Sequence, residues 1–257
     1  LYKALEASLP VFAHVPMVLG SDRARLSKRH GAMSVREYRD MGYLPDAVLN
    51  YLVRLGWSHG DHEFITREEL MAKFSLEHLG KSAVLFDPNK LQALNADHIQ
   101  AASPEALSVH LSPFLAARGI ADPAPEYLEA VIETLQTRSK TLLEMADGAL
   151  FYFQEKIVYE EKATQKFLKP AILEPLRLLI AQMEEQEVFT EQSVEAAFVQ
   201  TMEKSGLKLG KIAQPVRVAL TGKTVSPGIF EIIRVLGKEA TLKRLKQAAD
   251  YISGQGD

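Results

Sequence analysis

The chain of 257 residues is 47% hydrophobic and 25% charged, contains no cysteine and carries a formal net charge of −3. This composition excludes collagen-like, low-complexity and intrinsically disordered proteins, and the lack of cysteine excludes disulfides and thiolate sites. The slightly negative charge argues against a protein that binds nucleic acid regardless of sequence. No apolar run approaches the about 18 residues that span a bilayer. At about 150 residues per domain, the length predicts roughly two domains.

The first residues predict a helix over 1–9 that ends at Pro10, and the apolar run 11–19 is the one candidate strand. The chain begins with leucine instead of methionine and shows no signal or transit segment. We therefore expect a piece of a longer cytoplasmic protein, without membrane contact.

Helical signals dominate the rest of the sequence. Start and stop residues predict helices from Ser34; from Thr66, with Glu69 completing a capping box; from Ser103 and Pro104 to Gly119; twice within 127–155; over 191–204, ended by Gly206; from a Ser226 cap to Gly237; and over 239–252. Pro113 is expected to break or kink the third of these helices. The fold class predicted is mainly α.

Charge is unevenly distributed along the chain. Residues 21–40 contain six basic and three acidic side chains, residues 174–203 contain one and seven, and residues 204–257 contain ten and four. Charge alone favours solvated helix faces, although two basic stretches also fit two contacts with one polyanion. The seven histidines show no metal-binding spacing, and His59 and His62 are interpreted as loop residues, so no protein metal site is expected.

A basic pentapeptide is the segment best suited to a phosphate ligand. It consists of Arg25, Leu26, Ser27, Lys28 and Arg29. Clustered cations can neutralise a triphosphate, Ser27 adds a hydroxyl, and a helix from Ser34 would place its N-terminal amides near an anion. The alternative is an ordinary basic surface loop.

Residues 14–61, which contain RLSKR followed by HGA, resemble the second class I motif of bacterial glutamyl-tRNA synthetases, whose KMSKS loop is RLSKR here. Residues 86–99 (FDPNKLQALNADHI) resemble the stem-contact region of that family. Residues 211–245, which begin KIAQPVRVALTG, resemble the end of its anticodon-binding region. Three matches in the family's order are much harder to obtain by chance than one pentapeptide.

The resemblance implies roles for the first basic stretch. Lys28 would contact the ATP phosphates, and Arg25 stands where the family usually has lysine, so both are the catalytic candidates. Ser27, Met17 and Val18 would complete the ATP site, the last two beside the adenine ring. Cations at this place would neutralise charge that develops on the α-phosphate when glutamate attacks it. Mg²⁺ would arrive with ATP.

The family's other class I motif, HIGH, is absent from this sequence, as is the half that contains the glutamate pocket. The resemblance therefore implies a glutamate–tRNA ligase fragment that is inactive alone, with glutamate tRNA, ATP and glutamate as partners of the whole enzyme. Its parts would be the end of the catalytic domain (1–35), a stem-contact domain (36–102) and two helical anticodon-binding subdomains (103–155 and 156–257). The resemblance fits an enzyme for glutamate tRNA alone or for glutamine tRNA as well.

The C-terminal third carries the anticodon-binding candidates. From the residues alone, a helix start at Ser226-Pro227 could donate free amides, Phe230 could stack on a base and Arg217 could form forked hydrogen bonds. Equally, Ile229 and Phe230 could be core and Arg217 a salt-bridge partner. The resemblance assigns the anticodon pocket to the set Arg217, Ser226, Pro227, Ile229 and Phe230, together with Arg138, for which Lys140 is the competing alignment.

Two other interpretations remain open. A class I lysyl-tRNA synthetase shares the helical anticodon-binding architecture, although LSKRHGA and QPVRVALTG favour the glutamyl family. A non-catalytic helical RNA-binding or scaffold module could keep a degenerate loop, but the intact Ser27 and Lys28 argue against decay of that loop.

Overall fold

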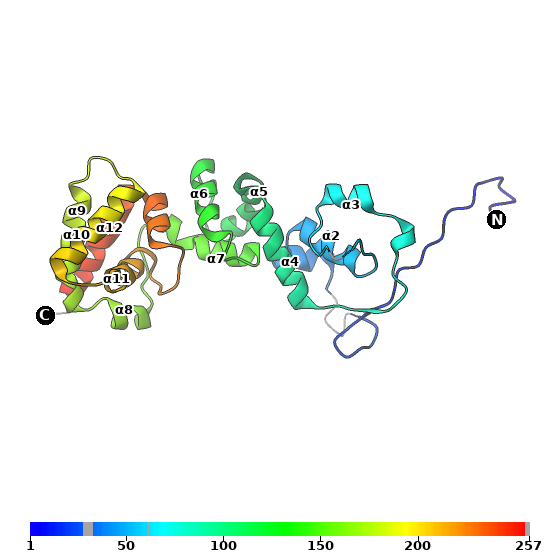
Figure 1. The fold of residues 1–257 in the computed structure, drawn as a ribbon, viewed down its shortest axis with the longest axis horizontal. Coiled ribbons are helices and arrows are strands. Elements are labelled where there is room, and N and C mark those ends of the chain that lie inside the picture. Colours follow the sequence, from blue (N-terminus) through cyan, green and yellow to red (C-terminus); the bar gives the residue numbers. More distant parts are fainter. Residues whose placement is uncertain (28–32, 61, 255–257) are drawn as a thin grey trace. The chain divides into compact units, whose positions relative to one another are not determined.

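The computed structural model describes residues 1–27, 33–60 and 62–254, and it divides into two compact units (Figure 1). Unit 1 comprises Leu1–Ala102 with the short segment Lys140–Leu142, and unit 2 comprises Ser103–Ser139 and Leu143–Asp257. Helices dominate both units, which confirms the mainly α prediction. The finer division into four parts stays a prediction.

Unit 1 combines short helices with a minimal parallel sheet. Its elements are β1 (Val18–Leu19), α1 (Val35–Asp40), α2 (Pro45–Arg54), α3 (Arg67–Lys73), the 3-10 turn η2 (Leu76–His78), β2 (Val84–Leu85) and α4 (Pro88–Ala101). The predicted helix starts at Ser34 and Thr66 are confirmed, since each residue forms a capping box with the glutamate three positions later. Val18 pairs with Val84 in the parallel ladder.

The first residues differ from the prediction. Residues 2–6 form turns instead of a helix, and the side chains of residues 1–15 are exposed. A nine-residue helix is not stable in water without packing, and this segment buries no apolar face. The expected strand over 11–19 is limited to Val18–Leu19, which follow Pro16.

The core of unit 1 lies between α2 and α4. Tyr43, Val48, Tyr51, Leu91 and Leu94 form the buried cluster. Apolar positions on one face of each helix are removed from water, which is the main stabilising contribution in a small unit.

Three buried polar side chains complete this core. The Asn50 side-chain oxygen accepts from the Ile65 amide (3.0 Å) and lies 3.0 Å from Nε2 of His98. Because an amide oxygen only accepts, His98 must donate through Nε2, and burial lowers the pKa of its ring. The Asn95 oxygen accepts from the Leu44 amide (2.8 Å), and its nitrogen donates to the Lys140 carbonyl (2.6 Å). These bonds explain why the segment Lys140–Leu142 belongs to unit 1.

Helices are the only regular secondary structure among the described residues of unit 2. Its elements are α5 (Pro104–Ala116), α6 (Pro125–Leu135), α7 (Leu142–Phe153), α8 (Glu161–Phe167), the 3-10 turn η3 (Pro170–Ile172), α9 (Leu173–Glu184), α10 (Glu191–Ser205), α11 (Leu209–Thr221) and α12 (Ile229–Ser253). The helix α12 packs against α9, α10, α11 and α6, and α5 packs against α6 (Figure 1). Phe198, Ile232, Ile233 and Leu245 are among its fully buried side chains.

Local signals located several helix ends in unit 2 correctly, although the sequence predictions do not include α8, α9 or α11. The Ser103 hydroxyl caps α5, two helices occupy 127–155, and Gly206 ends α10 in the left-handed conformation. Gly237 interrupts α12 with φ of 72° and ψ of 175°, so the predicted break between two helices is confirmed. The helix α5 continues through Pro113 to Ala116, so the expected break there is wrong; proline removes its own backbone donor from the helix.

None of the helices described is long and apolar enough to cross a membrane.

Candidate nucleic-acid interface

The ladder around β1 brings part of the predicted ATP site together. The Val84 amide donates to the Met17 carbonyl (3.0 Å), and the Leu26 amide donates to the Val18 carbonyl (2.9 Å). The chain thus reverses between Leu19 and Arg25, which form an antiparallel bridge. Met17, at 56% exposure, and Arg25 both face solvent. Lys28 and Arg29 lie outside the described residues.

The start of α1 offers less to an anion than the sequence suggested. The Glu37 amide donates to the Ser34 hydroxyl (3.3 Å), and the Ser34 amide donates to the Glu37 carboxylate. Two donors of the helix start are therefore already used inside the capping box, and the carboxylate adds negative charge there.

A pocket in unit 2 contains three of the predicted anticodon-binding residues. It has a volume of about 510 Å³ and lies between the turn that follows α6, one face of α7, the segment 154–160 and the loop after α11. Arg138, Ser226 and Pro227 line it. A cavity of this size lies within the range of about 300–1,000 Å³ that is usual for small-ligand sites, so one nucleobase could enter.

Two arginines converge on the loop at the edge of this pocket. Arg138 Nη1 and Arg217 Nη1 both donate to the Ser226 carbonyl, at 3.1 and 3.2 Å. Arg217 Nη1 also donates to the Pro227 carbonyl (2.6 Å) and to the Ser226 hydroxyl. Arg138 and Arg217, which are 79 positions apart in the sequence, thereby bind the same carbonyl oxygen.

The arginine pair places two guanidinium groups at the edge of the pocket. Burial lowers the pKa of Arg217, and the nearby positive charge of Arg138 lowers it further. The bonds described for Arg217 are to neutral oxygens and not to a carboxylate, so the salt-bridge alternative from the sequence does not describe it. The guanidinium N–H groups of the pair can donate to the acceptor atoms of a base. The lining also contains the carboxylates of Glu144, Asp147 and Glu160, so the pocket as a whole carries no net positive charge.

The prediction that Ser226 caps the last long helix is wrong. Gly228 is the N-cap of α12, and its amide donates to the Glu231 carboxylate (2.9 Å). The Ser226 hydroxyl instead accepts from Arg217 and donates to the Pro227 carbonyl (3.0 Å). A tertiary contact with an arginine on α11 takes the hydroxyl that a local cap would have used.

Ile229 and Phe230 point mainly to the interior of unit 2. Ile229 is buried, and the partly buried Phe230 ring packs edge-to-face on Phe198, with centroids 5.2 Å apart and an interplanar angle of 79°. Neither residue lines the pocket. A stacking role for Phe230 therefore stays a prediction, and its core contact is what the structure contains.

Arg138 fits the pocket better than the competing Lys140. Arg138 lines the cavity, whereas Lys140 belongs to unit 1, where its carbonyl accepts from Asn95.

Sequence reasoning missed the rim of the pocket. Val158 and Val225 line it with exposures of 81% and 78%, and Lys223 adds a cation. The rim depends on Gly222, which ends α11 at φ of 77° and whose carbonyl accepts from the Glu160 amide (2.9 Å). The signal available was a helix-ending glycine followed by a lysine, Gly222-Lys223, which the sequence shows without its spatial partner.

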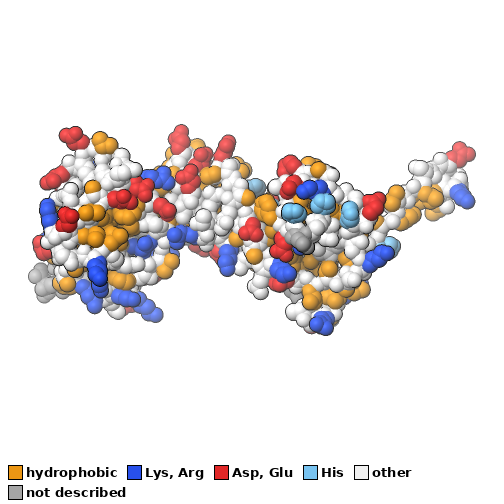
Figure 2. Space-filling view, in the orientation of Figure 1, with side chains coloured by type: hydrophobic (Ala, Val, Ile, Leu, Met, Phe, Trp, Pro, Cys, Tyr) orange, Lys and Arg blue, Asp and Glu red, His pale blue; other side chains and the backbone are white. Residues whose placement is uncertain are grey.

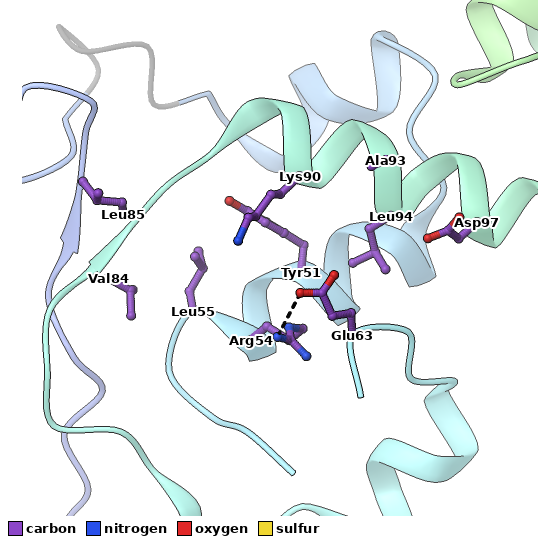
Figure 3. Close-up of a pocket in the computed structure, with 10 residues that line it drawn as sticks. All are labelled: Tyr51, Arg54, Leu55, Glu63, Val84, Leu85, Lys90, Ala93, Leu94 and Asp97. Carbon is purple, nitrogen blue, oxygen red and sulfur yellow. Dashed lines mark ion pairs between the residues drawn. The ribbon is translucent and has the colours of Figure 1, made fainter. Parts of the chain in front are cut away.

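A second pocket lies in unit 1, between α2, α4 and β2 (Figure 3). It has a volume of about 260 Å³, and Tyr51, Leu55 and Leu94 form its apolar part. The Arg54 guanidinium points to the Glu63 carboxylate, 3.6 Å away (Figure 3). The lining contains one further cation, Lys90, and one further carboxylate, Asp97. Because its charges cancel, this pocket offers no net positive potential to a phosphate.

Charge is segregated on the surface of unit 2 (Figure 2). Acidic side chains gather over α9 and α10, and Lys and Arg side chains gather over α8 and the start of α11. This segregation follows the opposite charges of residues 174–203 and 204–257. On α12, Lys246 is paired with Glu184 (2.5 Å), whereas Lys243 is exposed.

Among the residues that the structure describes, no group of three or more His, Cys, Asp or Glu side chains could hold a metal ion. His59 stacks on Trp57, with ring centroids 5.9 Å apart.

Two family descriptions match this chain. The anticodon binding domain matches residues 106–249, and the catalytic domain of class I tRNA synthetases (E and Q) matches residues 1–93. The first match includes the whole pocket of unit 2. The second includes Met17, Val18 and the pentapeptide.

Relatives and solved structures point the same way. The glutamate–tRNA ligases of Desulfosudis oleivorans and Syntrophobacter fumaroxidans are 58% and 56% identical, over 98% and 99% of this chain. The chain spans 54% of the length of each relative. A crystal structure of a glutamate tRNA ligase from Elizabethkingia meningosepticum, in complex with its amino acid, is similar with a TM-score of 0.82 and 25% identity. That similarity covers 98% of this chain and 53% of the other.

Proposed function

We propose, from the premise that this chain belongs to the anticodon binding domain family, that it is the tRNA-recognising part of a glutamate–tRNA ligase. The named relatives are glutamate–tRNA ligases, which favours glutamate over the lysine alternative. In the whole enzyme, ATP and glutamate would be the other substrates, and the reaction would take place in the cytoplasm.

One observation carries the proposal for unit 2. Arg138 and Arg217 converge on the Ser226 carbonyl at the edge of a pocket whose rim contains Val158 and Val225. Guanidinium donors beside an apolar rim suit an unstacked base, because the ring contacts aliphatic groups while its acceptor atoms meet the N–H donors. Single-stranded loops are the part of RNA that presents such bases, and the anticodon is one of them.

In unit 1, we propose that the exposed Met17 and Arg25 and the adjoining Ser27 and Lys28 form the ATP side of the catalytic domain. Arg25 and Lys28 would hold the phosphates and neutralise charge that develops on the α-phosphate. Arg25 could donate hydrogen bonds to two phosphate oxygens at once, whereas a lysine at this position would provide a point charge. Mg²⁺ would be held by the nucleotide and would add positive charge at the same phosphates.

We further propose that the 257-residue chain cannot form glutamyl-adenylate alone, because it lacks a HIGH motif and the family's glutamate pocket. ATP–pyrophosphate exchange with glutamate should not rise above the level without enzyme. The control is the same assay on a longer protein that includes the other half. Measurable exchange by the isolated chain would contradict this proposal.

The anticodon-reading role is tested by replacing Arg217. We expect Arg217→Ala to weaken the binding of glutamate tRNA by about 1–3 kcal/mol, as the loss of a base contact does. Binding of a tRNA with changed anticodon bases should hardly change. Affinities for the two tRNAs, measured by filter binding or fluorescence anisotropy at one salt concentration, give the comparison.

Two further variants separate the roles of neighbouring residues. Phe230→Ala should also reduce the binding free energy of the cognate tRNA by about 1–3 kcal/mol if the ring stacks on a base.

Lys243→Ala removes an exposed cation of α12. It should weaken the binding of both tRNAs alike and make binding less dependent on salt, as the loss of a phosphate contact does. If Arg217→Ala weakens the binding of both tRNAs equally, or changes the binding of neither, Arg217 does not read the anticodon.

A further inference from the structure

Arg244 is a buried cation that the proposed anticodon contacts do not include. It lies on α12 after the interruption at Gly237 and is only 4% exposed. Burying a guanidinium is costly unless its donors are satisfied. Its partners therefore indicate why the sequence places an arginine here instead of an apolar residue.

The partners of Arg244 are backbone carbonyls from two distant segments. Nη1 donates to the Leu220 carbonyl and Nη2 donates to the Gln154 carbonyl, each at 2.8 Å. Leu220 is in the last turn of α11, and Gln154 directly follows α7. The last carbonyls of a helix lack intrahelical partners and carry partial negative charge, so one guanidinium satisfies and neutralises two helix ends.

Three tyrosines near Arg244 favour its charged form. Burial lowers the pKa of the guanidinium, and Tyr127, Tyr159 and Tyr152 oppose that effect. The Tyr127 hydroxyl donates to the Tyr152 carbonyl (3.0 Å), which connects two of these residues.

Both helix ends continue directly into the wall of the pocket in unit 2. Gln154 lines the pocket itself, and Leu220 precedes Thr221 and the rim residues Lys223 and Val225. The two segments meet a second time where the Glu160 amide donates to the Gly222 carbonyl. Arg244 thus lies behind the pocket and connects the two segments that form it.

We propose that Arg244 is a positioning residue that sets the spacing of these two pocket walls without contacting RNA. The inference rests on the proposed anticodon role of the pocket. The guanidinium gives each carbonyl its own nitrogen, whereas a lysine would have to bring both carbonyls to one terminal nitrogen, as Lys238 does for the Glu184 and Gln186 carbonyls. Lysine at position 244 would therefore change the spacing of the two segments. The arginine therefore serves pocket geometry, and its loss should act on the walls before it acts on the rest of unit 2.

The experiment compares Arg244→Lys and Arg244→Met with a matched control, Arg234→Met. Arg234 lies on the same helix, but its side chain is half-exposed and pairs with Glu133 at 3.5 Å. Hydrogen exchange of the full 257-residue chain is measured first, without RNA. In both Arg244 variants, amides of 154–160 and 221–226 should exchange at least about 10-fold faster, and those of α10 should change little.

Binding to glutamate tRNA and to a tRNA with changed anticodon bases is measured next. The preference for glutamate tRNA should fall about 5- to 10-fold in both Arg244 variants, as the loss of one or two hydrogen bonds predicts. In Arg234→Met the preference should be unchanged. A wild-type chain without any preference would refute the anticodon role, while the localised exchange would still support positioning.

Three outcomes would overturn the proposal. They are uniform acceleration of exchange over unit 2, unchanged exchange at the two pocket segments, and unfolding of both Arg244 variants at the assay temperature. The first and third would assign Arg244 to the stability of the whole unit, and the second would show that the pocket walls do not depend on it.

Discussion

Replacing Gly222 by alanine is expected to lower the free energy of unfolding of unit 2 by about 2–5 kcal/mol. Gly222 has φ of 77°, a conformation that residues with a β-carbon rarely adopt. A β-carbon there would overlap the Val158 carbonyl oxygen and lie 3.1 Å from Ile157. Relief would require the segment before α8 to move away, although Glu160 is bonded to the same residue. Denaturant unfolding followed by circular dichroism measures the loss.

Gly206 provides the matched control for this substitution. It also ends a helix of unit 2, with φ of 69°, but a β-carbon there would meet nothing within 4 Å. Gly206→Ala should therefore show only the conformational cost of about 1–2 kcal/mol. The difference between the two variants isolates the steric contribution at the pocket rim. Equal losses would mean that the contact between Val158 and Gly222 is not tight.

Removing the cation of Lys28 is expected to have the largest effect on catalysis. In the longer ligase, Lys28→Ala should lower the rate of glutamate activation by about 10²-fold or more, the usual cost of losing one contact to transition-state charge. ATP–pyrophosphate exchange at saturating ATP and glutamate gives this rate directly. The expectation derives from the RLSKR motif and its place in the segment that matches the class I catalytic domain.

Arg36→Ala is the control for Lys28→Ala, because it removes the same charge from an exposed residue outside the motif. Its activation rate should stay within about 2-fold of the wild type, as is usual for exposed charges. An unchanged rate in Lys28→Ala would mean that RLSKR is only a basic surface loop. Equal losses in both variants would indicate an effect of net charge instead of a specific contact.

The locations of most helices could be predicted because their signals are local. The capping box of Thr66 and Glu69, the cap at Ser103 and the stop at Gly206 each depend on residues within four positions. The predicted helix over 1–9 failed for the complementary reason. Its residues are compatible with a helix, but nothing in unit 1 buries its apolar side.

The candidate site divides in the same way. Sequence identified Arg138, Arg217 and Ser226 as a group only through a family resemblance, since residues 79 positions apart in the sequence carry no mutual signal. The structure adds what joins them, which is a shared carbonyl at Ser226. It also shows that the Phe230 ring, which the sequence offered as a free stacking face, packs on Phe198.

By itself, the sequence determined the helical class, the capped ends of several helices and the family resemblance, because periodicity, caps and motifs are properties of neighbouring residues. Only the tertiary structure decided which side chains form the pocket. Arg244 bridges carbonyls that lie 24 and 90 positions away in the sequence, and Arg217 takes the hydroxyl of Ser226 away from its local cap. Such contacts depend on how helices pack, and packing is set by the whole apolar surface of unit 2 and not by any single segment.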